Sequence, residues 1–179
     1  HCGHIDAIHQ IENLFDDILL VPSAAHAFGK QMAPFDIRCM MLEMIIREML
    51  AVESTVKIDT IESNLFSDHP NTPVYTYDVL QAIKKRQTES CEITFIIGPD
   101  NARPNNWQRF YRHQDIEREF SVKVIEERLP WRSSLIRDWL DQTTSCPEFE
   151  EQILAATGHR LGEWLLSEEG HSYFVRSAI

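Results

Sequence analysis

Two histidines flank a glycine at the start of the chain, in the tetrad His1-Cys2-Gly3-His4. Glycine lets the backbone come close to an anion, because no Cβ stands in the way. A helix that begins at the tetrad would direct free N–H groups and the positive end of its dipole toward that anion. Histidine donates hydrogen bonds and can carry charge near neutral pH. The tetrad therefore predicts a phosphate-binding turn in which His1 and His4 do the chemistry. A zinc site made of His1, His4 and His9 is the alternative.

A second group of polar residues occurs late in the chain, in the segment Arg132-Ser133-Ser134-Leu135-Ile136-Arg137. Two hydroxyls at the start of a helix lie beside N–H groups that the helix leaves unsatisfied, and this arrangement can cradle phosphate oxygens. Arg137, one turn further on, could reach back as a charge-assisted donor. Ordinary helix capping with a surface arginine explains the same residues equally well.

The turn Gly98-Pro99-Asp100-Asn101 follows a continuous apolar run. Gly98 would let a sugar or a base lie close to the end of a strand, and Asp100 could accept hydrogen bonds from ribose hydroxyls. All four residue types also favour plain turns, and on local evidence a strand-ending turn is the better interpretation.

Basic and aromatic side chains lie near these segments. His26, Lys30 and Arg38 could contact phosphate, although taken singly each is better explained as a surface residue. An aromatic cluster follows Gly98 and could stack on a heterocyclic ring, although aromatic residues in such a segment more often belong to a core. Its members are Trp107, Phe110 and Tyr111.

Helix and strand patterns alternate along the chain. The spacing of apolar residues predicts helices over residues 4–15, 36–50, 75–86, 133–140, 147–157 and 160–169, and strands over residues 17–21, 55–61, 92–97 and 121–125. We expect Thr76 and Ser133 to cap the helices that they begin.

Strands separated by helices indicate parallel pairing in a layered α/β sheet, because a crossover helix returns the chain to the same edge. Such sheets bind ligands at the carboxyl ends of their strands. This rule selects three places in the chain, namely His1 to His4, Pro22 to Lys30 and Gly98 to Trp107.

Composition limits the class of protein. A chain of 179 residues with 43% hydrophobic content can form one domain with a sizeable core. A formal charge of −11 argues against non-specific nucleic-acid binding. No run of about 18 apolar residues predicts a membrane span. The cysteines are scattered without a C-x-x-C pair, which predicts reduced thiols in a cytoplasmic protein. They are Cys2, Cys39, Cys91 and Cys146.

Taken together and in order, these segments resemble the nicotinate/nicotinamide mononucleotide adenylyltransferases of the HxGH nucleotidyltransferase superfamily. The resemblance runs from His1 to about Leu140, and more loosely to Tyr173. The family's H-x-G-H, (S/T)-Y-T, F-I-I-G-x-D and S-(S/T)-x-I-R motifs all have counterparts here. The matching segments are His1-Cys2-Gly3-His4, Val21-Pro22-Ser23, Lys30 with Arg38, Tyr75-Thr76-Tyr77, Phe95-Ile96-Ile97-Gly98-Pro99-Asp100 and Ser133-Ser134-Leu135-Ile136-Arg137.

The resemblance implies a Rossmann-like parallel sheet flanked by helices, with a small helical C-terminal part. It implies a single nucleotidyltransferase domain over residues 1–179, in which 147–179 form the helical subregion. The implied reaction transfers AMP from ATP to nicotinate or nicotinamide mononucleotide and releases pyrophosphate, in NAD biosynthesis. Mg²⁺ would accompany ATP and be held mostly by the nucleotide, without a metal site of the protein's own.

The same resemblance assigns roles to individual residues. The implied catalytic residues are His1 and His4. The implied ATP and phosphate contacts are Ser133, Ser134, Ile136, Arg137, Lys30 and Gly98. The implied contacts to the acceptor nucleotide are Thr76, Asp100, Trp107 and Phe110.

The chain departs from the family pattern in several places. The G-x-F-x-P segment expected before His1 does not occur, so we expect a further strand and loop upstream. Arg132 stands where a serine is usual, and Phe110 stands where the family has a ring-stacking tryptophan. The segment before Ser133 is also shorter. These departures leave open a different acceptor, such as pantetheine phosphate or a sugar or polyol phosphate. They also leave open a paralogue that binds nucleotide without turnover, and homo-oligomerisation stays open as well.

Overall fold

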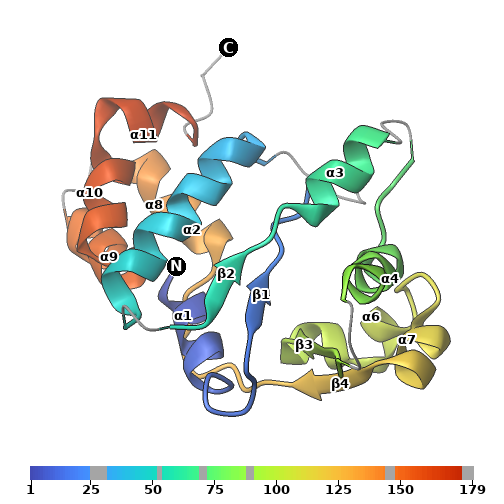
Figure 1. The fold of residues 1–179 in the computed structure, drawn as a ribbon. Coiled ribbons are helices and arrows are strands. Elements are labelled where there is room, and N and C mark those ends of the chain that lie inside the picture. The colour runs from blue at the N-terminus through green and yellow to red at the C-terminus, as the bar shows by residue number, and fades with distance from the viewer. Residues whose placement is uncertain (25–31, 52–53, 69–71, 88–90, 144–147, 175–179) are drawn as a thin grey trace. The chain divides into compact units, whose positions relative to one another are not determined.

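The computed structural model describes residues 1–24, 32–51, 54–68, 72–87, 91–143 and 148–174 (Figure 1). The chain divides into two compact units, each with its own packing. Unit 1 consists of His1–Ile18, Ala33–Lys57 and Arg128–Ile179, and unit 2 of Leu19–Met32 and Ile58–Glu127. A single nucleotidyltransferase domain over the whole chain stays a prediction.

Helices and strands alternate through most of the chain, as the apolar spacing predicts. The elements are α1 (Cys2–His9), β1 (Ile18–Leu20), α2 (Phe35–Met49), β2 (Val56–Ile58), α3 (Ile61–Asp68), α4 (Thr76–Arg86), β3 (Thr94–Ile97), α5 (Pro99–Ala102), α6 (Pro104–Trp107), α7 (His113–Glu119), β4 (Ser121–Val124), α8 (Ser133–Gln142), α9 (Glu148–Thr157), α10 (His159–Leu166) and α11 (Glu168–Ser172).

The strands β3 and β4 pair in parallel, with Thr94 opposite Ser121 and Ile97 opposite Val124. Helices α5, α6 and α7 form the crossover between them. Because the strands run the same way, both carboxyl ends lie at one edge, and Gly98 follows β3 at that edge. The predicted α/β class with parallel strands and flanking helices is confirmed.

The strands β1 and β2 form a second two-stranded sheet. The Ile18 N–H donates to the Thr55 carbonyl at 3.3 Å, and the Asp59 N–H donates to the Leu20 carbonyl at 2.8 Å. Both strands advance in the same direction between these two bonds, as a parallel pair does. The carboxyl edge of this sheet therefore carries the segment after Leu20 and the start of α3.

Helix α4 is buried on two faces. One face contributes Tyr77 and Leu80 to a core that includes Ile116 of α7. The other face contributes Val79 and Ile83 to a core shared with the first residue of α3. Packing on both sides fixes α4 within unit 2, and it therefore also fixes Thr76, the first residue of this helix.

The helices of unit 1 surround a core that includes Ile45 of α2, Leu140 of α8 and Ile153 of α9, each at most 1% exposed. Helix α10 packs against α2, α9 and α11. At Gly162 of α10, a Cβ would lie 2.7 Å from a methyl group of Leu154, so only glycine allows this close helix contact. The predicted C-terminal helical part is present as α9, α10 and α11.

The Glu48 carboxylate of α2 binds the start of α10. Glu48 accepts hydrogen bonds from the backbone N–H groups of His159 at 2.8 Å and Arg160 at 2.9 Å. These are orphan donors at the start of α10, where a negative charge is also favoured by the helix dipole. Gly158 precedes them with φ of +81°, a left-handed conformation that suits glycine.

Several predicted boundaries are wrong. Thr76 and Ser133 do not cap their helices; the extended backbone at the helix boundary belongs to Tyr75 and Arg132, and neither supplies a side-chain cap. The predicted strand over residues 55–61 ends at Ile58, because Asp59 accepts a hydrogen bond from the Ile61 N–H and starts α3.

Other differences concern short helices. The first helix ends at His9 instead of residue 15, and the chain continues in tighter turns. The sequence analysis did not predict α3 or the short helices α5, α6, α7 and α11. Helices this short contain too few turns for a clear apolar periodicity. Within the described ranges, no helix has both the length and the apolar character needed to cross a membrane.

Candidate functional site

The two histidines of the tetrad lie ring against ring at the start of α1. Their centroids are 4.1 Å apart, and the ring planes are inclined by 21°. His1 is the N-cap of α1 without a side-chain cap bond, and the His4 N–H donates to the His1 carbonyl at 2.9 Å. The predicted pair of imidazoles at a helix start is therefore present as one stacked unit.

A side chain at Gly3 would crowd the tetrad. A Cβ at this position would lie 2.9 Å from His1 Nδ1 and 3.3 Å from the backbone carbonyl oxygen of Trp131. Trp131 lies just before α8, so the tetrad borders the segment that leads into the Ser133-Ser134 pair. Two segments that are far apart in the sequence, and that were each predicted to bind phosphate, thus meet within unit 1.

The environment of the tetrad controls its charge. The His4 side chain is exposed, and desolvation, followed by the charge of the His1 amino group, lowers its pKa from 6.5 to about 4. His1 Nδ1 is buried and has no hydrogen-bond partner within the described residues. A neutral His4 can stack on the neighbouring ring without charge repulsion and still donate an N–H to an anion.

The start of α8 exposes the hydroxyls of Ser133 and Ser134. Arg132 is the N-cap and supplies no side-chain cap bond, so its side chain does not occupy the first N–H groups of α8. Arg137 is half-buried one turn later, and its guanidinium makes no ion pair within the described part of the chain. Ile136 points into the core at 6% exposure, and its N–H donates to the Arg132 carbonyl at 3.1 Å. The Ile136 side chain therefore anchors the helix, and its role toward phosphate stays a prediction.

Gly98 lies in unit 2, at the carboxyl end of β3. Its φ of −76° is one that any residue adopts, and a Cβ built on it meets nothing within 4 Å. In contrast to Gly3 and Gly162, no chain contact requires glycine here, and the space beside the strand end is open. Asp100 follows in α5, where its carboxylate pairs with Arg103 at 3.5 Å.

Thr76 is the first residue of α4, and the N-cap Tyr75 donates or accepts no side-chain cap bond. The ring of Tyr111 lies against Tyr75, with centroids 4.6 Å apart. A helix start without a side-chain cap therefore adjoins an exposed aromatic ring.

Trp107 and Phe110 lie ring to ring, with centroids 5.1 Å apart. The Trp107 Nε1–H donates to Glu117 at 2.6 Å, and the ring packs against the core of unit 2. Phe110 also contacts Phe95 of β3, at 6.3 Å between centroids. Both rings are half-buried, so these residues serve the core on one side while the other side keeps contact with solvent.

Among the predicted basic residues, Lys30 and His26 lie outside the described residues. Arg38 lies in α2, where its Nε donates to the Ala33 carbonyl at 2.9 Å and its guanidinium lies 5.4 Å from the centroid of Phe35. These contacts keep Arg38 near the start of α2.

One buried carboxylate, Glu62 of α3, was not among the residues predicted for the site. It is 9% exposed, and its Oε1 accepts a hydrogen bond from the Ala24 N–H at 3.0 Å. Ala24 follows β1 at the carboxyl edge of the β1–β2 sheet. A glutamate directly after the apolar Ile61 was the available signal, since a charged residue at the start of a helix can reach a neighbouring backbone.

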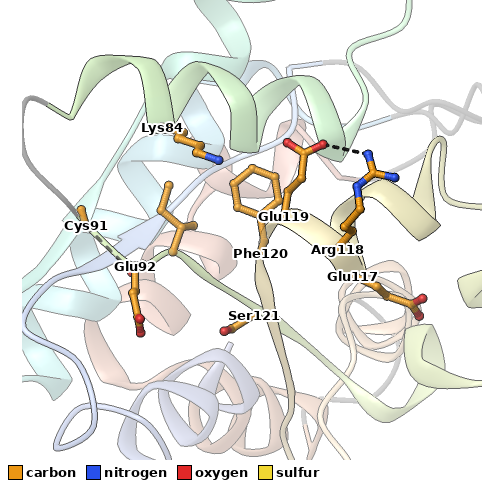
Figure 2. Close-up of a pocket in the computed structure, with 9 residues that line it drawn as sticks. Lys84, Cys91, Glu92, Glu117, Arg118, Glu119, Phe120 and Ser121 are labelled. Carbon is orange, nitrogen blue, oxygen red and sulfur yellow. Dashed lines mark hydrogen bonds and ion pairs between the residues drawn. The ribbon is translucent and has the colours of Figure 1, made fainter.

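Unit 2 contains a hollow of about 410 Å³. Its lining includes Lys84, Cys91 and Ser121 (Figure 2). Cys91 precedes β3 and Ser121 begins β4, so the hollow lies at the amino ends of these strands. Gly98 lies at the opposite edge. None of the residues predicted for the site lines this hollow.

The donor groups at the tetrad are imidazoles, hydroxyls and backbone N–H groups. Among the described residues, no three His, Cys, Asp or Glu side chains gather as a metal site would require. His9, the third member of the alternative zinc site, lies 3.0 Å from Glu12 instead. Mg²⁺ prefers oxygen ligands. The donor groups present therefore suit an anion, and Mg²⁺ that arrives with the nucleotide stays a prediction.

An α/β fold with parallel strands, a histidine tetrad at a helix start and a serine pair beside it defines a nucleotidyltransferase-type protein. The chain belongs to the cytidylyltransferase-like family, whose model matches residues 1–138. It is 30% identical over 122 residues to a Myxococcus xanthus (strain DK1622) protein named "Probable nicotinate-nucleotide adenylyltransferase". That match covers 66% of this chain and 59% of the relative, so the chain spans less than two thirds of the relative's length.

A solved structure gives the same result for the fold. The chain superimposes with a TM-score of 0.72 and 29% identity on a Vibrio parahaemolyticus crystal structure described as a "Putative Nicotinate-nucleotide Adenylyltransferase". The match covers 92% of this chain and 90% of the other. The predicted family and fold class are confirmed.

Proposed function

We propose that this protein transfers AMP from ATP to nicotinate mononucleotide and releases pyrophosphate, as a step of NAD biosynthesis. The observation that carries the proposal is that the tetrad lies against the segment entering α8. A Cβ built on Gly3 would lie 3.3 Å from the Trp131 carbonyl oxygen. This proximity supports the proposal because Trp131 stands two residues before the serine pair, in the segment that leads to Arg137 within unit 1. Both relatives reported above carry names of this activity.

The phosphate chemistry would be done by positioning and charge. A phosphate oxygen of the acceptor attacks the α-phosphorus of ATP, a new P–O bond forms, and the bond to pyrophosphate breaks. The acceptor phosphate is already ionised, so the step needs no general base. His1 and His4 would donate hydrogen bonds to the triphosphate, where negative charge builds up on the leaving group. Mg²⁺ bound to the phosphates would neutralise part of that charge.

The start of α8 would hold the remaining phosphate oxygens. Its N–H groups carry the positive end of the helix dipole, and the hydroxyls of Ser133 and Ser134 are exposed beside them. The Arg137 guanidinium has no carboxylate partner among the described residues to compete with phosphate. An unopposed guanidinium is the stronger donor to an anion, because phosphate need not displace an ion pair.

The residues predicted to contact the sugar and the acceptor ring lie in unit 2. The open space at Gly98 suits a ribose lying close to the end of β3, with Asp100 beside it. Thr76 begins α4 without a side-chain cap, and the Tyr75–Tyr111 pair adjoins it. A helix start favours a carboxylate over a neutral amide. This preference supports nicotinate over nicotinamide mononucleotide, with Trp107 and Phe110 near the ring.

The test is pyrophosphate release by the full chain with ATP and Mg²⁺, using one acceptor at a time. We expect release with nicotinate mononucleotide and at least ten-fold less with nicotinamide mononucleotide, about the discrimination that one charge interaction of ~1.4 kcal/mol provides. Release only with pantetheine phosphate or a polyol phosphate would move the protein to another acceptor class. ATP binding without release from any acceptor would refute the proposed reaction.

A further inference from the structure

Three consecutive residues in unit 2 each pack against an aromatic ring. In the turn formed by residues 110–112, Phe110 packs against Trp107 with centroids 5.1 Å apart. Tyr111 lies against Tyr75 at 4.6 Å. The Arg112 guanidinium lies over the ring of Tyr77, 4.0 Å from its centroid. We name these residues the aromatic turn.

Arg112 is held in a strained conformation. With φ of 57° and ψ of 37°, it is left-handed, and among the described residues it is the non-glycine residue with positive φ. Such a conformation persists only where the surroundings fix it, and it concentrates at functional sites. Two contacts do so here: an ion pair from Arg112 Nε to Asp115, and the stack on Tyr77. The ion pair uses the edge of the guanidinium plane, and the stack uses its face.

The ring below Arg112 is itself fixed. Tyr77 is 7% exposed, and its hydroxyl donates to Glu119 at 3.2 Å. Gln81 donates to the same hydroxyl at 2.9 Å. Figure 2 shows Glu119 beside α4, paired with Arg118. Tyr77 therefore gives Arg112 a rigid surface to stack on.

The aromatic turn holds both neighbours of Thr76. Arg112 covers Tyr77 and Tyr111 covers Tyr75, so the start of α4 is fixed on both sides of Thr76 by one turn. An ordinary backbone conformation at residue 112 would send the chain in another direction from α7. Tyr111 could not then lie on Tyr75 while Arg112 lies on Tyr77.

We propose that Arg112 is a positioning residue for the acceptor nucleotide. Its left-handed backbone, its stack on Tyr77 and its ion pair with Asp115 set the place of Tyr111 and of the start of α4. These two features form the acceptor subsite of the proposed function, on which this inference rests. Arg112 acts through Tyr111 and Thr76 and makes no contact with the reacting phosphates.

The test separates the backbone of Arg112 from its side chain. Both Arg112→Ala and Arg112→Gly remove the stack and the ion pair that hold the left-handed backbone, but glycine adopts positive φ freely while alanine does not. We expect KM for nicotinate mononucleotide to rise about ten-fold in Arg112→Ala and about three-fold in Arg112→Gly, the range that a lost cation–π contact and added strain provide. KM for ATP should stay within about two-fold, since the phosphate contacts lie elsewhere.

Arg118→Ala is the matched control. Arg118 pairs with the same Asp115 and with Glu119, and it lies outside the aromatic turn. Without Arg118, Glu119 keeps its hydrogen bonds from Tyr77 and Gln81, so the ring below Arg112 stays in place. The KM of Arg118→Ala for nicotinate mononucleotide should match the wild-type value. Equal effects in Arg118→Ala and Arg112→Ala would show that loss of charge near Asp115 is sufficient, and would overturn the inference.

The remaining outcomes are also decisive. Wild-type protein without turnover on any acceptor refutes the proposed function before any variant is made. Active wild-type protein with unchanged acceptor KM in both Arg112 variants overturns the inference alone, and so does an equal rise in KM for ATP. If Arg112→Ala does not fold, Arg112→Gly carries the test, because it relieves the strain.

Discussion

Replacing Gly3 by alanine tests whether the tetrad works through the exact place of the His1 ring. The new Cβ would lie 2.9 Å from His1 Nδ1, closer than real Cβ atoms come to other heavy atoms. The ring is the end of a side chain, so it can move, but it then leaves its 4.1 Å stack on His4. We expect the Gly3→Ala variant to keep its fold but to lose the stacked arrangement of the His1 and His4 rings.

The size of the effect follows from that distance. An ordinary contact is at least about 3.4 Å, so the His1 ring must shift by roughly 0.5 Å or more, and a misplacement of about 1 Å costs on the order of 100-fold in rate. We therefore expect kcat for pyrophosphate release to fall by about 10- to 100-fold. The free energy of unfolding should change by less than about 1 kcal/mol, because alanine gains up to ~1 kcal/mol of helix propensity while contact with the Trp131 carbonyl offsets part of it.

The assay pairs initial rates of pyrophosphate release with urea unfolding of the same samples. Ala7→Gly in the same helix is the matched control, since it should lose up to about 1 kcal/mol of stability and keep full turnover. Gly3→Ala with wild-type kcat would remove the His1 ring from the mechanism. A fall in kcat that only follows a loss of folded protein would refute the steric argument.

Three further predictions follow from the structure. Gly98→Ala should leave thermal stability unchanged or raised, because no atom lies near the new Cβ, and should raise KM for ATP by about ten-fold as a methyl enters the ribose space; an unchanged KM would mean that nothing binds close to Gly98. Glu62→Leu leaves the Ala24 N–H unpaired and should lower the free energy of unfolding by about 1–3 kcal/mol. Turnover per folded molecule should also fall, because Ala24 lies at the carboxyl edge of the β1–β2 sheet. Glu48→Leu removes a comparable carboxylate cap in unit 1 and should lower stability alone, so equal rates in the two variants would contradict a role for Glu62 at the strand edge. Because the folded-state pKa of His4 is lowered from 6.5 to about 4, the folded state resists protonation of this ring, and the free energy of unfolding should fall as pH drops from 6.5 toward 4. Urea unfolding of His4→Gln should show a smaller fall over the same range. Identical pH profiles for the two proteins would contradict the lowered pKa of His4.

The sequence determined the parts of this protein that depend on local preference. Continuous apolar residues before Gly98 predict β3, and apolar spacing in residues 36–50 and 75–86 predicts α2 and α4 within a residue or two. The ordered motifs from the tetrad to Arg137 also select the family, which the comparison over residues 1–138 confirms. Each of these signals lies within one segment of chain, where periodicity and residue type act directly on the backbone.

Only the tertiary structure decided what individual residues do. The sequence treats Gly3 and Gly98 alike, yet a Cβ on Gly3 would crowd the His1 ring and the Trp131 carbonyl, whereas a Cβ on Gly98 meets no described residue within 4 Å. Glu62 reaches Ala24 across 38 positions, and Glu48 reaches His159 across 111. The left-handed Arg112 depends in the same way on Tyr77, a residue of another helix. Residue patterns report how a segment prefers to fold, but such contacts exist only after distant segments pack, because packing energy then outweighs local preference.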